Sequence, residues 1–396
     1  EVPYLGLLRA VLGYVNTRSY SYADLANAIN IYTGGITSGV SMYPDLKNHD
    51  AMAVKFEIRM KVLESNLEHA MKLAEEILNS SDLHDTKRLA ELIAQVKSRL
   101  QVNLSSSGHT VAAMRALSYE SVYAFYNDAT IGIAYNQMIR RLDEQMKENP
   151  QAVAEKLQQL IEKVFVRKRM LVSFTGEEGS YEKASPIMQE GTPAQAAIHP
   201  VLSKKNEGFT DASQIQYVAR SGNFISHGYA YHGTLKILKM ILSYEYLWMN
   251  IRVKGGAYGC MSSFLRTGDS YFVSYRDPNL AKTNAVYEKI PEYVASFDPD
   301  ERDMTKYIIG TFGALDTPLN PEAKGSRSMA AYLEHLTYEE IQKERDEILT
   351  ATPADIRSLS DLIASILSDQ CLCVVGNEHA IREESGMFTS IQGLCE

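Results

Sequence analysis

The hydrophobic positions at the start of the chain follow a helical period. In PYLGLLRAVLGYV, Pro3 stands where a helix can begin, and Leu5, Leu8, Val11, Leu12 and Val15 fall on one side. We therefore expect a helix with one buried face. The same period predicts helices between Asn66 and about Leu117, at about 128–146 and at 150–165.

Other segments alternate between apolar and polar residues, as a half-buried strand does. In AMAVKFEIRMKVLE the apolar residues from Val54 to Val62 occupy every second position. QIQYVARSG, SYFVSYRD and CLCVVG are also predicted strands, and the short apolar run RMLVSFTG is predicted as another. Between them, TLKILKMILSYEYLW predicts an apolar helix, and Thr337 with Glu340 predicts a capped helix start.

The order of these segments repeats. Strand FEIRMKV, several helices and strand RMLVSFTG are matched, roughly 200 residues later, by strand YFVSYRD, several helices and strand CLCVVG. This order predicts an α+β fold of two tandem homologous domains, each a mainly antiparallel sheet covered by helices. We place them at residues 1–185 and 212–396, with a linker at 186–211. Because Glu1 opens directly into helical sequence, the first strand of the first domain is expected upstream of it.

Composition narrows the possible partners. The 396 residues carry a formal net charge of −9, and Lys and Arg form no basic stripe, so neither nucleic acid nor a membrane is an expected partner. Cys371 and Cys373 would point the same way from a strand, which favours core thiols over metal ligands or a disulfide. Reduced thiols in turn predict an intracellular location. Neither a GxSxG elbow nor a phosphate-binding GxxxxGK[ST] sequence occurs.

The segment WMNIRVKGGAYGCMSSF, residues 248–264, carries the strongest local signal. Gly255 and Gly256 permit a sharp bend or the close approach of another backbone, with Arg252 before them and Tyr258 after them. A fixed guanidinium and phenol could stabilise the oxyanion that forms on a peptide carbonyl. The alternative is a glycine turn with a surface arginine and a buried tyrosine, and residue types alone favour that structural interpretation.

The segment IRVKGGAYG closely resembles the Arg-x-x-Gly-Gly-Ala-Tyr-Gly sequence of presequence proteases and falcilysin, a branch of the pitrilysin/insulinase metallopeptidases. The start of the chain, GHTVAAMRALSYESV and SYRDPNLAKTNAVYE resemble other parts of the same proteins. The resemblance implies the C-terminal half of a zinc endopeptidase that degrades unstructured peptides in a closed chamber. Arg252 and Tyr258 would complete the active site of the N-terminal catalytic half, and Gly255, Gly256 and Ala257 would bind substrate.

The resemblance also implies where zinc is bound. These enzymes hold it through a His-x-x-Glu-His motif in the N-terminal half, and the nearest sequence here has Ser65 in place of the first histidine, before Glu68 and His69. Neither this site nor the spaced pair His227 and His232 predicts a metal site, so we expect no metal in this chain and no activity when it is alone. The rival hypothesis is a non-catalytic binding or assembly subunit of the same fold. The expected location is the bacterial cytoplasm or an organelle matrix.

Overall fold

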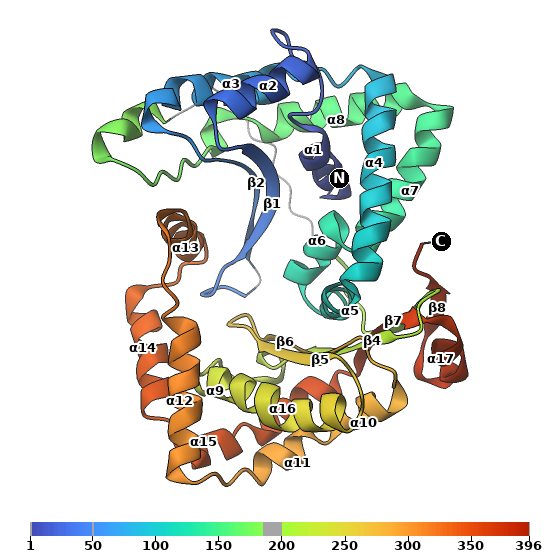
Figure 1. The fold of residues 1–396 in the computed structure, drawn as a ribbon, viewed down its shortest axis with the longest axis vertical. Coiled ribbons are helices and arrows are strands. Elements are labelled where there is room, and N and C mark those ends of the chain that lie inside the picture. The colour runs from blue at the N-terminus through green and yellow to red at the C-terminus, as the bar shows by residue number, and fades with distance from the viewer. Residues whose placement is uncertain (1, 50, 185–199, 396) are drawn as a thin grey trace.

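The structure is a computed structural model that describes residues 2–49, 51–184 and 200–395, and it has two lobes (Figure 1). The first lobe is mainly helical and carries one long two-stranded ribbon, whereas the second is built on a six-stranded sheet. The predicted α+β class is confirmed. The two lobes differ in the number of their strands, and their origin by duplication stays a prediction.

The first lobe packs its helices around one apolar core, which includes Leu8, Val11 and Val15 of the predicted N-terminal helix face. Strands β1 and β2 pair antiparallel, with Ile36 opposite Met60 and Pro44 opposite Met52. The elements of this lobe are α1 (Val2–Val11), α2 (Tyr22–Tyr32), β1 (Ile36–Pro44), β2 (Met52–Met60), η1 (Glu64–Asn66), α3 (Leu67–Ser80), α4 (Thr86–Ser106), α5 (Gly108–Leu117), α6 (Val122–Ile131), α7 (Ile133–Glu148), α8 (Pro150–Val164), η2 (Arg167–Arg169) and η3 (Glu178–Lys183).

One predicted strand of the first lobe is wrong. RMLVSFTG, residues 169–176, forms no strand, because no strand among the described residues lies beside it to pair with its backbone groups. Instead, Phe174 packs against a small cluster that includes Leu67, Met71 and Ala184. The predicted repeat of elements therefore lacks its closing strand in the first lobe.

The second lobe is organised by a mixed sheet in the order β5-β6-β4-β7-β3-β8. Neighbouring strands are antiparallel from β5 to β7, whereas β3 is parallel to both β7 and β8. The elements are β3 (Asn206–Asp211), β4 (Gln216–Asn223), η4 (Ile225–His227), α9 (Thr234–Ile241), η5 (Leu242–Tyr246), η6 (Trp248–Val253), β5 (Gly259–Phe264), β6 (Asp269–Tyr275), α10 (Ala281–Glu288), α11 (Ile290–Ala295), α12 (Glu301–Leu315), α13 (Pro321–Leu333), α14 (Tyr338–Leu349), α15 (Pro353–Arg357), α16 (Ser360–Ser368), β7 (Cys371–Asn377), α17 (Glu378–Glu383), η7 (Ser385–Met387) and β8 (Ser390–Gly393).

The predicted linker needs a correction at its C-terminal end. Its last six residues, Asn206–Asp211, form β3 inside the six-stranded sheet. Residues 186–199 of the predicted linker lie outside the described residues. The predicted capped helix start at Thr337 with Glu340 is confirmed, and Thr352 with Asp355 forms a second capping box. Cys371 and Cys373 are free, fully buried thiols in one core cluster, as predicted.

The sheet joins the two lobes because a first-lobe helix covers one of its faces. Helix α5 packs on β4, β6 and β7, while α9, α10 and α16 contact the strands from the second lobe (Figure 1). A Cβ on Gly108, at the start of α5, would lie 2.2 Å from the Tyr217 ring of β4, so glycine permits the close approach.

A buried ionic network fixes this junction. Arg115 of α5 donates from Nη1 to Asp128 and from Nε to Glu207 of β3, each at 2.7 Å, and Tyr119 donates to Glu207 at 2.8 Å. Burial alone would raise the pKa of Glu207, but the Arg115 guanidinium holds it below its usual value. The largely buried arginine therefore neutralises carboxylates from both lobes.

A second junction lies at the tip of the β1–β2 ribbon, which reaches down to α13 (Figure 1). Asp45 lies 3.1 Å from His335 Nδ1, and the Leu46 N–H donates to the Glu334 carbonyl at 3.0 Å. Lys47 also pairs with Glu340. The two lobes thus touch at the sheet and again at this ribbon tip.

Glu120, just after α5, makes the junction sensitive to pH. Lys204 Nζ lies 3.0 Å from Glu120 and 2.6 Å from Asp369, and Asp369 also bonds His227 Nε2 at 2.7 Å. Burial, with the nearby Asp369 carboxylate, raises the pKa of Glu120 to about 7 from 4.5. Because the folded-state pKa lies above the unfolded one, ionised Glu120 destabilises the fold increasingly as pH rises through this window.

We expect Glu120→Gln to raise the melting temperature relative to wild type, with a gain that grows between pH 4.5 and 7 and then levels off. Thermal unfolding followed by circular dichroism at several pH values measures it. Glu322→Gln, on the exposed side of α13, removes a carboxyl elsewhere and is the control for the mutation itself. A change in melting temperature that does not vary with pH in Glu120→Gln would contradict the shifted pKa.

Candidate functional site

The candidate site is built at the end of a long helical run that changes form. The run begins as α9 and continues through η5 and η6, both of which are π-helical. Its inner side is fully buried, with Leu242, Leu247 and Ile251 in the core of the second lobe. A π-helix places one more residue in each hydrogen-bonded turn, and such segments occur frequently at functional sites.

The two glycines end this run for different reasons. Gly256 has a φ of +80°, which side chains other than glycine rarely adopt. A Cβ on Gly255 would lie 2.4 Å from the Ile251 carbonyl oxygen. The turn they permit sends the N–H of Gly256 to the Arg252 carbonyl at 2.9 Å and that of Ala257 to the Ile251 carbonyl at 3.1 Å. The chain therefore reverses within a few residues and enters β5.

The turn brings Arg252 and Tyr258 together. Arg252 donates from Nη1 to the backbone carbonyl of Tyr258. Its Cζ atom also lies 5.3 Å from the centre of the Tyr258 ring and 4.3 Å from that of Trp248. The guanidinium thus lies against two aromatic rings.

Tyr258 projects from the turn, with 64% of its surface exposed. Its backbone is anchored by an N–H bond to the Tyr275 carbonyl at 3.0 Å, and its ring meets the Tyr275 ring edge-on at 5.9 Å. Tyr275 in turn contacts His109 of α5 at 4.7 Å. Burial lowers the pKa of His109, which favours the neutral ring. A row of rings therefore connects the exposed phenol with the first lobe.

The three residues predicted to bind substrate lie in different environments. Gly256 is exposed, whereas the Ala257 side chain is buried in the core. The Gly255 carbonyl accepts a hydrogen bond from Asn279 Nδ2 at 2.6 Å, and the Asn279 N–H donates to Asp277 Oδ1 at 2.8 Å. Gly256 is therefore the best placed of the three to meet a ligand, and a direct contact by any of them stays a prediction.

Two family profiles match the chain. The profile of the associated region of peptidase M16, subfamily C, covers residues 1–142, and that of the PreP C-terminal domain covers residues 206–377. Protein HypA of Clostridium perfringens is 38% identical over 402 residues, a match that includes 100% of this chain and 41% of HypA. The chain belongs to the M16 peptidase family. It spans well under half the length of the curated relatives it matches.

Further relatives agree with this M16 assignment and with its presequence protease branch. Presequence protease 1 of Arabidopsis thaliana is 28% identical over 375 residues, with 91% of this chain and 34% of that protein covered. A crystal structure named as the peptidase M16 inactive domain from Pseudomonas fluorescens superposes with a TM-score of 0.55 at 13% identity, covering 95% of this chain and 89% of that one. The second comparison shows a shared fold.

Residues 65–69, which most resemble the zinc-binding motif of M16 peptidases in sequence, do not supply its metal ligands. Ser65 supplies no imidazole, Glu68 is exposed, and the His69 ring stacks on Tyr32 with the ring centres 4.4 Å apart. Within residues 2–49, 51–184 and 200–395, the structure brings together no group of three or more His, Cys, Asp or Glu that could hold a metal ion.

His227 and His232 likewise go to separate partners. His227 bonds Asp369, while His232 Nδ1 lies 2.9 Å from Thr234 Oγ1 and its Nε2 lies 3.5 Å from Glu347. Their spacing therefore reflects two structural roles. In the part of the chain that is described, no helix is both long and apolar enough to cross a membrane.

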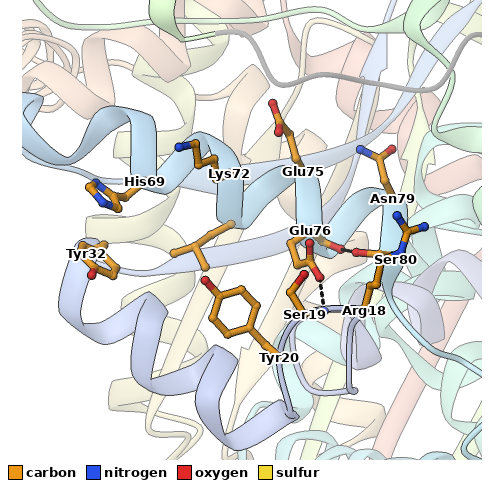
Figure 2. Close-up of a pocket in the computed structure, with 11 residues that line it drawn as sticks. Arg18, Ser19, Tyr20, Tyr32, His69, Lys72, Glu75, Glu76, Asn79 and Ser80 are labelled. Atoms are coloured by element: carbon orange, nitrogen blue, oxygen red, sulfur yellow. Dashed lines mark hydrogen bonds between the residues drawn. The ribbon is translucent and has the colours of Figure 1, made fainter.

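A polar hollow of about 590 Å³ lies between α2 and α3 of the first lobe (Figure 2). Glu76 accepts a hydrogen bond from the Ser19 N–H at 2.7 Å. Burial alone would raise the pKa of Glu76, but hydrogen bonds from Ser19, Thr17 and Ser80 lower it. The carboxylate therefore braces the loop before α2, and we assign no chemistry to this hollow.

The sequence did not single out two residues that shape the site. Trp248 stands four residues before Arg252, a spacing that brings side chains together on a helix, and this spacing could have revealed it. Asn279 lies more than twenty residues after the glycines, so only the paired strands β5 and β6 bring it back to them.

Proposed function

We propose that this chain is the zinc-free half of an M16 endopeptidase, which closes over unstructured peptides and supplies Arg252 and Tyr258 to the reacting carbonyl. Membership of the family and the match to 41% of HypA support a division of labour with a second half. The Arg252–Tyr258 arrangement supports a catalytic contribution from this one.

The observation that carries the proposal is an arginine and an exposed tyrosine held beside each other on a braced turn. A guanidinium has five N–H donors, and one Arg252 donor is engaged by the Tyr258 carbonyl. No carboxylate in the described part of the chain pairs with it. Positioned donors of this kind stabilise an oxyanion more than they stabilise the neutral carbonyl, and such differential binding accelerates the reaction.

The proposal assigns the remaining chemistry to an N-terminal catalytic half. Zinc bound there would supply an activated water, and this chain would orient the peptide and stabilise charge on its carbonyl oxygen. Closure of the two halves would complete the site and select peptides small and unfolded enough to be enclosed. Nucleic acid and membranes are not proposed partners, and an intracellular or organellar compartment remains the expectation.

Reconstitution tests this division. We expect the chain alone to cleave no unstructured peptide, and a mixture with the separately produced N-terminal half to restore cleavage. Fluorogenic peptide hydrolysis and zinc content of each half and of the mixture are the measurements. Arg252→Ala in the same mixture is the matched control. It separates a catalytic contribution of Arg252 from the assembly of the two halves.

Two outcomes would contradict the proposal. Cleavage by the chain alone would show a catalytic centre within it. A mixture that assembles but never cleaves would favour the rival hypothesis of a binding or assembly subunit.

A further inference from the structure

Trp248 and Arg252 project from the same turn of η6, and the Arg252 guanidinium lies over the Trp248 indole. The guanidinium carbon lies 4.3 Å from the indole centre and 5.3 Å from the Tyr258 ring centre. Both distances are within the range in which an aromatic face attracts a cation, and indole attracts most strongly. Trp248 is 39% exposed, so the pair lies at the surface beside the protruding Tyr258.

Four other arginines that lie over rings in this protein are also held by carboxylates. Arg115 bonds Asp128 and Glu207, Arg266 lies 2.6 Å from Glu344, and Arg345 pairs with Asp316 at 2.6 Å. Arg88 over Tyr22 likewise pairs with Glu91 at 3.1 Å. Arg252 departs from this pattern, as does Arg276 over the Tyr275 ring at 5.6 Å, because within the described ranges no acidic side chain pairs with either.

A guanidinium held by rings keeps more of its N–H donors available than one held by a carboxylate. A carboxylate occupies N–H donors of a guanidinium, whereas an aromatic ring contacts its face and leaves the N–H edge available. Rings can therefore fix the plane of Arg252 without competing with an incoming carbonyl oxygen. One N–H bonds the Tyr258 carbonyl and sets the rotation within that plane.

We propose that Trp248 is a positioning residue for Arg252: its indole holds the guanidinium flat so that the free N–H edge meets the substrate carbonyl. This inference rests on the proposed function and adds a residue that acts through Arg252 and does not touch the reacting atoms. Without the indole, the long arginine side chain has more rotamers to lose when the transition state forms.

A double-mutant cycle tests the proposal in the protease assembled from both halves. We expect Trp248→Leu to lower kcat about fivefold with little change in KM, and Trp248→Phe, which keeps a ring, to lower it less. In an Arg252→Ala background, Trp248→Leu should have no further effect, because the side chain it positions is gone. An equal loss in both backgrounds, or none in either, would overturn the positioning role.

Tyr244→Leu is the matched control. Tyr244 is 66% exposed on η5, in the π-helical turn before Trp248, and the same loss of a large aromatic there should leave kcat unchanged. A fivefold loss in this variant would indicate a general contribution of the exposed helix face and would contradict a specific role for Trp248.

Trp248 is the only tryptophan among the 396 residues, so the contact can also be tested without catalysis. We expect Arg252→Ala to change the tryptophan emission of the isolated chain, because the charge 4.3 Å from the indole disappears and water reaches that face. Tyr244→Leu should change it far less. Identical spectra for wild type and Arg252→Ala would overturn the contact.

Different results would contradict the proposed function and the positioning role of Trp248. An Arg252→Ala variant with full turnover would contradict the proposed function. An Arg252→Ala variant with reduced turnover, combined with additive losses from Trp248→Leu, would contradict the positioning role alone.

Discussion

Arg252→Ala is expected to lower the turnover of the assembled protease by a factor of about ten to a thousand, as the loss of an oxyanion donor typically does. Tyr258→Phe should lower it within the same range, because it removes the hydroxyl and keeps the ring that contacts Arg252 and Tyr275. The effect should fall mainly on kcat, since the donors act on charge that develops in the transition state. Initial rates of cleavage of an unstructured peptide measure it.

Two further variants separate the geometry of Arg252 from its charge. Arg252→Lys keeps a cation without the planar fork of donors, so only part of the activity should remain. Lys254→Ala removes an exposed cation two residues away and should leave turnover within about twofold of wild type. Wild-type turnover in both Arg252→Ala and Tyr258→Phe would remove the catalytic role of this motif.

The second large effect concerns stability. Arg115→Met is expected to lower the free energy of unfolding by about 3–5 kcal/mol at pH 7, because buried Asp128 and Glu207 would lose their shared cation. Denaturation in urea followed by circular dichroism measures the loss. Arg345→Met is the control: its pair with Asp316 is solvated, so its loss should cost much less than the loss of Arg115.

The deficit of Arg115→Met should also depend on pH in a defined direction. In the wild type the folded-state pKa of Glu207 is lowered, so its contribution is present above the unfolded pKa of 4.5 and is lost as pH falls. In the variant, Glu207 can take up a proton on acidification, which removes the unpaired charge. The difference between the two proteins should therefore shrink toward pH 4.5, and a constant difference would contradict an ionic origin.

Elements with strong periodicity could be predicted from the sequence, whereas those that depend on distant partners could not. Helix α1 and strands β2, β4, β6 and β7 are where the apolar pattern places them. The apolar pattern did not predict helix α2, because only its residues Leu25 and Ala28 are buried and its apolar stripe is narrow. Strand β1 was missed as well, although it pairs with the predicted β2 along its whole length.

Strand β3 shows why local pattern was insufficient for the linker. Its sequence NEGFTD contains two charged residues and a glycine, a composition typical of a loop. Arg115, which lies 92 residues away, supplies the cation that lets Glu207 be buried in the sheet. The strand is therefore specified by a contact that no window of sequence contains.

The candidate site was predictable to the same degree. The glycine pair indicated a turn, and Arg252 and Tyr258 indicated the chemistry that the turn could carry. Both signals could be recognised because all these residues lie within seven positions of the sequence. The conformation of the preceding helix was not predictable, since TLKILKMILSYEYLW has the apolar spacing of an ordinary α-helix. That conformation decides which way Trp248 and Arg252 point.

The π-helical form of residues 242–253 consequently makes the length of this segment part of the design of the site. A helix turns by roughly a quarter turn per residue, so deleting one residue of η5 would rotate the side chains that follow by about that much if α9 kept its packing. The guanidinium would then face the core or open water, with every functional residue still present. The number of residues between α9 and Arg252 therefore matters for the chemistry as much as the identity of those residues.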